Sequence, residues 1–185
     1  MAPAGRRRER FQIPQRVGAP AEVNYGGLPG PDYGPLVRDR IPIRSIEKRD
    51  LRTLVDIDRQ ISGIDRSDYF ARKLEEAIHE SDVRMSLVAE IDSVVVGFLM
   101  ARVDFGEFGL IEPTAVLDTL GVHVEYRNRG VGRALMSQLL VNLMTLRVQH
   151  LRTDIAWHDH ELLAFFDRCG FGPSQRLCLT YPIGA

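Results

Sequence analysis

The apolar residues of the chain follow two different spacings. Alternation with polar or small residues, the period of a strand, predicts a strand at 114–124, and two apolar segments on either side of a turn signal predict strands at 84–91 and 94–103. Spacings of three and four, the period of a helix, predict helices in the segments 47–62, 65–78 and from Val131 onward. Asp92 and Ser93, two short polar residues, predict a hairpin turn between the first two strands.

Shorter elements precede and follow these segments. Pro42–Arg44 is typical of an edge strand, where proline is tolerated. Leu151–Trp157 predicts another strand, and Asp159–Cys169 predicts a short helix that ends at the glycine C-cap of Gly170 and Phe171. With a final strand, the order is strand, two helices, three strands, helix, strand, helix, strand. This order predicts an α+β fold with helices on a mixed sheet.

Composition separates the first forty residues from the rest. Residues 1–40 are rich in proline, glycine and arginine and carry no sustained apolar period, so we expect a disordered tail. Residues 41–185 are expected to form one domain, because 185 residues with 44% apolar and 26% charged content suffice for a single core. The basic cluster from Arg6 to Arg10 is typical of a solvated segment.

Charge, cysteine content and hydropathy narrow the functional classes. The formal net charge of −1 gives no overall attraction to nucleic acid or to an anionic membrane, so neither is expected as a partner. The longest apolar run, Val94–Ala101, has eight residues, fewer than half of the roughly 20 that a membrane span needs. Cys169 and Cys178 are too few for a disulfide framework, and the basic N-terminus lacks the apolar segment of a secretory signal. We therefore expect a cytoplasmic protein with reduced thiols.

The segment from Asp118 to Ala134 carries the candidate chemistry. It runs from the end of a predicted strand to the start of a predicted helix, and the turn between them contains Arg127-x-x-Gly130-x-Gly132. A ligand can approach the backbone closely at the two glycines. The first N–H groups of a helix have no intrahelical partner and lie at the positive end of its dipole. With Arg127, Arg129 and Arg133 around them, these groups predict a site for a phosphate or pyrophosphate.

Two better-known glycine motifs do not fit this turn. A P-loop requires Gly-Lys-Ser/Thr after its glycines, and a dinucleotide fingerprint requires Gly-x-Gly-x-x-Gly after a strand. A strand, Arg-x-x-Gly-x-Gly and an amphipathic helix instead resemble the acyl-CoA pyrophosphate site of the GNAT superfamily of N-acyltransferases. The strand, helix and Gly170–Phe171 about forty residues downstream resemble the second conserved block of that superfamily. The resemblance covers roughly residues 41–183.

The resemblance implies a fold and a cofactor. The fold is a mixed, mostly antiparallel sheet with helices on both faces, and acetyl-CoA lies in a wedge between two central strands, those that end at Val124 and Trp157. The backbone near Val122 would polarise the thioester carbonyl. The cofactor-binding residues that the resemblance implies are Val122, Val124, Arg127, Arg129, Gly130, Val131, Gly132, Arg133, Ala134 and Phe166.

The resemblance also implies direct attack of a primary amine on the thioester. A lysine amine with a pKa of about 10.4 is neutral about one part in a thousand at pH 7.4, whereas an α-amine near 7.7 to 8 is neutral to roughly a third, so a base matters more for lysine-like acceptors. Asp154 lies where ribosomal-protein N-terminal acetyltransferases carry a glutamate, and Asp118 lies on the strand face where other members place theirs. Each is equally compatible with a solvated or arginine-paired carboxylate, and Glu112, in a loop, is a third candidate.

Two positions depart from the family pattern. Phe166 stands where many members carry a tyrosine that is thought to protonate the departing thiolate, and Asp159 stands where they carry an asparagine. A thiol with a pKa near 8.5 leaves tolerably without an acid, and water or Tyr126 could replace the tyrosine. His158 and His160 are two residues apart and do not share a helix face, so no metal site is predicted.

We therefore predict an acetyl-CoA-dependent N-acetyltransferase that acts on the primary amine of a small molecule, a protein N-terminus or a lysine. The alternative from another class is a non-catalytic acyl-CoA-binding regulatory domain, which turnover of acetyl-CoA would distinguish. A third hypothesis, an RNA-associated protein that uses the basic tail, predicts steeply salt-dependent binding. The acceptor, the acyl length, the choice of carboxylate and the presence of a homodimer stay open at this point.

Overall fold

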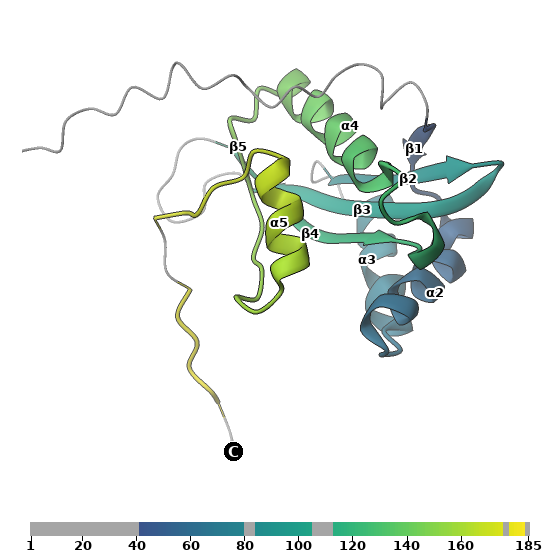
Figure 1. The fold of residues 1–185 in the computed structure, drawn as a ribbon, viewed down its shortest axis with the longest axis horizontal. Helices are drawn as coiled ribbons and strands as arrows, with labels where there is room; N and C mark the ends of the chain where they lie inside the picture. Colours follow the sequence, from purple (N-terminus) through teal and green to yellow (C-terminus); the bar gives the residue numbers. More distant parts are fainter. Residues whose placement is uncertain (1–40, 80–83, 105–112, 176–177, 184–185) are drawn as a thin grey trace, which may run out of the picture. The chain divides into compact units, whose positions relative to one another are not determined.

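The computed structural model describes residues 41–79, 84–104, 113–175 and 178–183. Its strands form a five-stranded sheet in the order β1-β2-β3-β4-β5 (Figure 1). These strands are β1 (Ile43–Ser45), β2 (Arg84–Ile91), β3 (Val94–Asp104), β4 (Thr114–Val122) and β5 (His150–Arg152). The first four pair antiparallel, and β4 pairs with β5 in parallel. The predicted mixed, mostly antiparallel sheet is confirmed, with β5 at the edge of the described sheet rather than at its centre.

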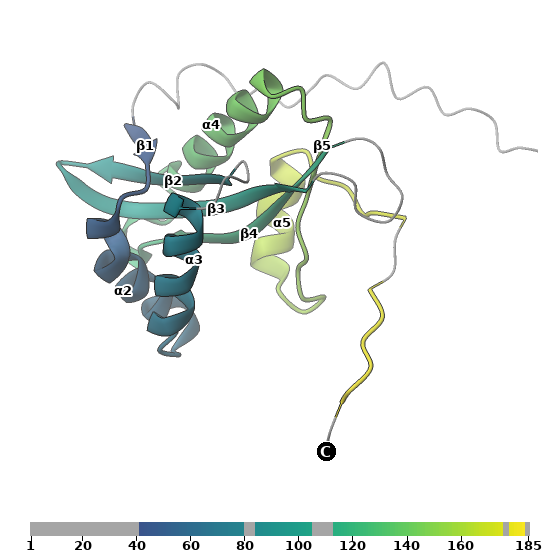
Figure 2. The same ribbon diagram turned by 180° about the vertical axis from the view of Figure 1, so that it is seen from behind.

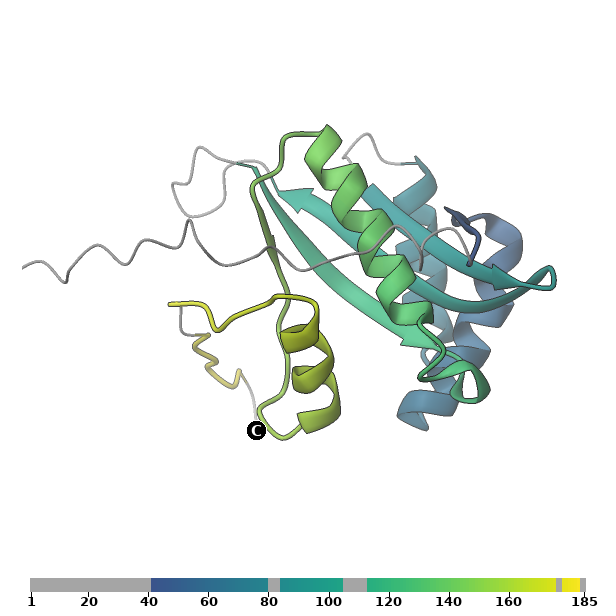
Figure 3. The same cartoon turned by 45° about the horizontal axis from the view of Figure 1, so that its top comes forward.

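Helices cover both faces of this sheet. A 3-10 turn, η2 (Lys48–Asp50), leads into α2 (Leu51–Ser62), which packs with α3 (Ser67–His79) on the face that Figure 2 turns toward the viewer. Helix α4 (Val131–Thr145) crosses the opposite face, and in Figure 3 it lies in front of the sheet with α2 and α3 behind it. Helix α5 (His160–Arg168) contributes to the same core as α4.

Each face of the sheet has its own hydrophobic core. On the α4 face, fully buried side chains of β3 and α4 meet: Leu99, Leu135, Met136 and Leu139. On the other face, fully buried side chains of α2, α3 and β3 meet: Leu54, Ile57, Phe70 and Phe98. Strand β3 therefore lies between two cores, which explains why its sequence is a nearly unbroken apolar run.

The turn between α2 and α3 is held by two carboxylates. Asp65 accepts the N–H of Ser67, the first residue of α3, at 2.9 Å. Arg66 pairs with both carboxylate oxygens of Asp58, a residue that is only 4% exposed. Because a buried carboxylate without its partner would be costly, this pair fixes the position of the turn on the domain.

Three predicted elements differ from the structure. The strand predicted at 114–124 ends at Val122, because His123 begins a 3-10 turn, η4 (Val124–Tyr126). The strand predicted at Leu151–Trp157 is wrong beyond Arg152, where the Thr153 hydroxyl donates to the Leu117 carbonyl at 3.0 Å in place of a main-chain ladder bond. No strand follows α5 within residues 169–175 and 178–183, so the expected final strand is not found there. The predicted tail, residues 1–40, and Glu112 lie outside the described residues.

We expect the substitution Gly121→Ala to destabilise the domain by about 1 to 3 kcal/mol, the usual cost of overpacking. A Cβ atom at Gly121 would lie 2.6 Å from the ring of Phe98, which is fully buried and packs edge-on against Phe70. The ring therefore has little room to move. Urea unfolding measures the effect, and Gly172→Ala is the matched control because a Cβ there meets nothing within 4 Å. Equal stability of both variants would contradict the packing described here.

Candidate active site

The turn from β4 to α4 reverses the chain through two residues with left-handed backbones. Asn128 has φ of 60° and Gly130 has φ of 86°. Gly130 is the N-cap of α4 and needs the freedom of glycine, because a side chain at this φ is strained. Gly130, which the sequence predicts as part of the phosphate-binding motif, therefore also provides the backbone conformation that connects the turn to α4.

The N-terminus of α4 leaves its first amides open. Gly130 makes no side-chain cap, and the N–H of Ala134 is the donor that bonds back to the Gly130 carbonyl, at 2.9 Å. The N–H groups of Val131, Gly132 and Arg133 precede that first helical bond and have no intrahelical acceptor. They point out of the helix start in one direction, which is the geometry that binds an anion.

A cleft of about 1010 Å³ opens in front of these amides. Its walls come from the end of β4, the turn and start of α4, one face of α5, and Ile61 of α2. Six of the predicted cofactor-binding residues line it: Val122, Arg127, Gly130, Val131, Gly132 and Arg133. The structure thus brings most of the predicted residues together around one cavity.

The other four predicted residues do not line the cleft. Val124 is exposed on η4, and Ala134 is fully buried in the α4 core. The Arg129 guanidinium lies over the ring of Tyr126 at 5.1 Å, and Tyr126 itself lines the cleft. Phe166 is 3% exposed and packs its ring against Phe165 and Phe171.

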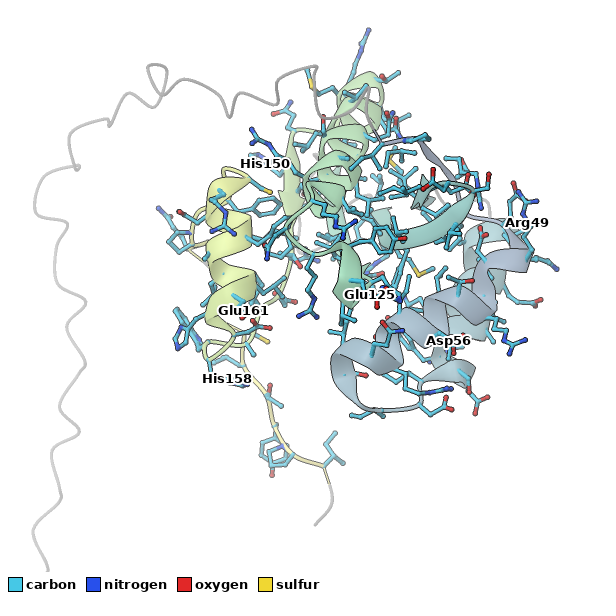
Figure 4. The ribbon with its side chains drawn as sticks, turned by 45° about the vertical axis from the view of Figure 1, so that its right-hand side comes forward. Arg49, Asp56, Glu125, His150, His158 and Glu161 are labelled. Carbon is cyan, nitrogen blue, oxygen red and sulfur yellow. The ribbon has the colours of Figure 1, made fainter. Side chains whose placement is uncertain are left out.

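One face of α5 forms the second wall, and the sequence reasoning missed it. Glu161, Phe165 and Arg168 are spaced by four and three residues, so they share a helix face, and all of them line the cleft. Phe165 lies opposite the glycine motif at the start of α4. A Cβ atom placed on Gly132 would be 3.1 Å from the Phe165 ring. The same spacing was available in the sequence and could have indicated these residues. Glu161 is labelled at the start of α5 in Figure 4, and Glu125 on the turn before α4.

Strands β4 and β5 separate beside this cleft. Their pairing is limited to Thr114–Val116 with His150–Arg152, so the described β4 continues past Val116 without a main-chain partner on that side. Past this point β4 has a β-bulge against β3: Leu117 and Thr119 pair with adjacent residues of β3, which leaves Asp118 as the extra residue. The open backbone of β4 beyond the bulge offers hydrogen-bonding groups to an extended ligand.

The two predicted catalytic carboxylates lie in different surroundings. Asp118 is mostly buried and pairs with Arg102 of β3 and with Lys73 of α3, whose Nζ is 3.2 Å from its carboxylate. Arg102 also pairs with Asp104 at 3.0 Å. Asp154 is exposed in the segment after β5, and neither aspartate is among the residues that line the cleft. Asp118 is therefore part of an ion-pair network, whereas Asp154 is open to solvent.

The charges of the cleft are separated along α5. Asp159 and Glu161 lie at the start of the helix, where Asp159 accepts the N–H of Leu162 at 3.0 Å as its cap. Arg168 lies in the last turn, next to Cys169. Burial raises the pKa of the Cys169 thiol, and the positive charges of Arg133 and Arg168 act against that rise.

Two further properties concern the described residues as a set. Among them, no group of three or more His, Cys, Asp or Glu side chains is placed to hold a metal ion. None of the helices in the same residues has the length and apolar character needed to cross a membrane.

Comparison with known proteins identifies relatives of this architecture. The family described as the acetyltransferase (GNAT) family matches residues 51–171. A transcriptional regulator from Bacillus halodurans C-125 has a TM-score of 0.67 at 16% identity, over 76% of this chain and 99% of that chain. The aminoglycoside N-acetyltransferase AAC(6')-Iy in complex with CoA has a TM-score of 0.66 at 19% identity, over 77% of this chain and 94% of that chain. The aminoglycoside 6'-N-acetyltransferase AAC(6')-Ih from Acinetobacter baumannii has a TM-score of 0.65 at 19% identity, over 78% and 99%. At these identities the structures establish the shared fold.

Proposed function

Because the chain belongs to the acetyltransferase (GNAT) family, we propose that it transfers an acetyl group from acetyl-CoA to a primary amine. The observation that carries this proposal is the open N-terminus of α4 at the wall of a large cleft. Open amides and the guanidinium groups of Arg127 and Arg133 suit the pyrophosphate of CoA. The unpaired edge of β4 suits the pantetheine, whose amides can bond to a free strand backbone.

The chemical step requires little beyond positioning. The amine nitrogen attacks the thioester carbonyl, a C–N bond forms, the C–S bond breaks, and the amine loses a proton. Main-chain N–H groups near Val122, which lines the cleft, would stabilise the oxyanion. Holding both reactants in this geometry supplies most of the rate enhancement.

Asp154 and Asp118 remain our proposed bases for the proton of the amine. Asp154 is exposed and could act through a water molecule. Asp118 lies at the bulge of β4, but it already accepts from Arg102 and Lys73, so protonation would have to weaken those pairs. This difference favours Asp154 as the residue that exchanges a proton and Asp118 as a residue that holds β3, β4 and α3 together.

The thiolate can leave without an acid, and a hydroxyl near it would assist by donating a proton. Phe166 has no hydroxyl and its ring is buried, so it does not serve as an acid. Tyr126 lines the cleft from η4 and carries a phenol, which makes it our candidate acid, with water as the alternative. The absence of a hydroxyl at Phe166 is also the observation that favours the second candidate function, an acyl-CoA-binding regulatory domain without catalysis.

A scan of acceptors with acetyl-CoA tests the proposal, read out as release of free thiol. Peptide N-termini, lysine peptides and small polyamines cover the predicted acceptor classes, and aminoglycosides belong in the scan because structural neighbours are described as acetyltransferases of these compounds. Thiol release with one class supports the enzyme and names its acceptor. Tight CoA binding without turnover of any acceptor would support the regulatory domain instead. The cytoplasmic location and the tail at residues 1–40 stay predictions, and the presence of a homodimer stays open.

A further inference from the structure

The segment of residues 178–183 exposes three large apolar side chains. Leu179, Tyr181 and Ile183 are 89%, 85% and 93% exposed. They are spaced by two, so in an extended chain they share one face. Figure 1 and Figure 2 both show the segment running away from the sheet. Single exposed apolar residues are common on protein surfaces, but three on one face of a short segment mark a contact surface.

Strand β5 has a free edge within the described part of the chain. It is the last strand in the order of the sheet and pairs on one side, with β4. The core at this end of the sheet is also incompletely covered, because Leu151, Ile155 and Phe171 pack against it but are only partly buried. The main-chain groups of a free edge strand pair readily with another extended chain. The edge of β5 therefore offers both main-chain bonds and apolar surface to an added strand.

The segment 178–183 has the sequence of such a strand. Its leucine, threonine, tyrosine and isoleucine include the β-branched and aromatic residues that strands favour. Pro182 has no N–H to donate, and an edge strand tolerates this. The chain thus carries both halves of one more strand pair, yet in the single chain the segment lies off the sheet and β5 stays at the edge. Two copies can satisfy both halves by exchanging their segments.

We propose that residues 178–183 of one copy add as a strand to the free edge of β5 in a second copy, and that the exchange is reciprocal. Main-chain bonds join the two strands, and Leu179, Tyr181 and Ile183 cover the partly buried core residues of the other copy. Both contacts of the homodimer are then the same, as two-fold symmetry requires. Neither half of the contact lines the cleft, so the dimer does not depend on the proposed activity.

Sedimentation velocity of the full chain tests this dimer. We expect the wild-type protein to sediment with the mass of two chains. Leu179→Asp should raise the dissociation constant by about tenfold or more, because the interface would have to bury a carboxylate among apolar side chains. The domain should stay folded, since Leu179 is exposed in its own chain, and a thermal melt checks this.

Ile64→Asp is the matched control for a new charge at an exposed apolar position. Ile64 is 61% exposed in the turn between α2 and α3, and its replacement should leave the dimer unchanged. A wild-type protein that sediments as a monomer, or an equally tight dimer in Leu179→Asp, would overturn the exchange.

Cross-linking shows which copy supplies the segment. Cys178 is an exposed thiol, whereas Cys169 is buried. Two chains with different tags are co-expressed: one keeps Cys178, and the other carries His150→Cys together with Cys178→Ser. His150 is an exposed residue of β5 and is labelled in Figure 4. A short bismaleimide cross-linker should join the two chains.

Two further cross-linking samples complete this test. Glu75→Cys in place of His150→Cys gives the background, because Glu75 is exposed on α3, and it should yield no joined chains. A single chain that carries both Cys178 and His150→Cys reports on pairing within one copy. Cross-links confined to single chains in that sample would show that the segment pairs with its own β5, and this would overturn the exchange.

Discussion

Replacing Gly132 with aspartate is expected to lower the affinity for CoA by an order of magnitude or more while the fold survives. The new carboxylate would lie among the open amides of α4, where the pyrophosphate is expected to bind, and like charges there repel. The Cβ atom would also lie 3.1 Å and 3.2 Å from two atoms of the Phe165 ring, so the ring must move by a few tenths of an ångström. Calorimetry measures the affinity, and a thermal melt checks that the domain remains folded.

Two further variants separate charge from size at this position. Gly132→Ala adds the Cβ without the carboxylate, so it should cost less affinity than Gly132→Asp if charge dominates. Gly172→Asp adds the same carboxylate at an exposed glycine outside the cleft, where a Cβ meets nothing within 4 Å, and it should bind CoA normally. An unchanged CoA affinity in Gly132→Asp would remove the pyrophosphate assignment.

Local spacing was enough to predict most of the fold, and the reason is burial. Strand β3 lies between two cores, so almost every residue from Val95 to Ala101 is buried and the sequence is continuously apolar. Helix α4 buries one face against the sheet, which produces the spacing of Leu135, Leu139 and Leu143. Where an element buries one of its faces, the buried residues are apolar and recur at a regular spacing. That spacing predicts the element from the sequence alone.

Elements that depend on long-range bonds could not be predicted in this way. Directly after the short β5, the Thr153 hydroxyl bonds to the carbonyl of Leu117, 36 positions earlier in the chain. The bulge at Asp118 depends on the alignment of β4 with β3 rather than on any residue of β4 alone. Neither contact is visible in the spacing of the apolar residues, so the sequence shows neither the end of β5 at Arg152 nor the bulge inside β4.

In the candidate site too, one part follows from consecutive residues and the other part depends on tertiary contacts. The motif from Arg127 to Arg133 was predictable because backbone freedom and charge are properties of consecutive residues. The wall from α5 and the burial of Phe166 depend on how two helices pack, and the sequence shows only which residues share a helix face. The partners of Asp118, Lys73 and Arg102, come from two other elements and were not predicted at all.

The largest expected effect on activity is at Asp154. If Asp154 is the base, Asp154→Asn should lower kcat/KM by about 10²- to 10⁴-fold near neutral pH, the usual contribution of a general base. The loss should shrink as the pH rises, because above the pKa of the amine the solvent has already removed the proton that Asp154 would take. Activity from pH 6.5 to 9.5, with CoA affinity checked separately, measures both the size and the slope of the effect. Asp167→Asn, at an exposed position of α5 outside the cleft, is the control for the loss of one surface charge.

Asp118→Asn distinguishes the two carboxylates, because its surroundings predict a different signature. Removing this charge leaves Arg102 and Lys73 facing a neutral amide, so we expect lower stability and a loss of activity that does not vary with pH. Asp104→Asn disturbs the same network from β3, where Asp104 pairs with Arg102 and Arg152, and it should produce a similar pH-independent loss. A loss in Asp118→Asn that disappears at high pH and is absent in Asp104→Asn would make Asp118 the base instead. If neither Asp118→Asn nor Asp154→Asn changes kcat/KM, neither aspartate is the base. The proton of the amine must then pass to water or to Glu112.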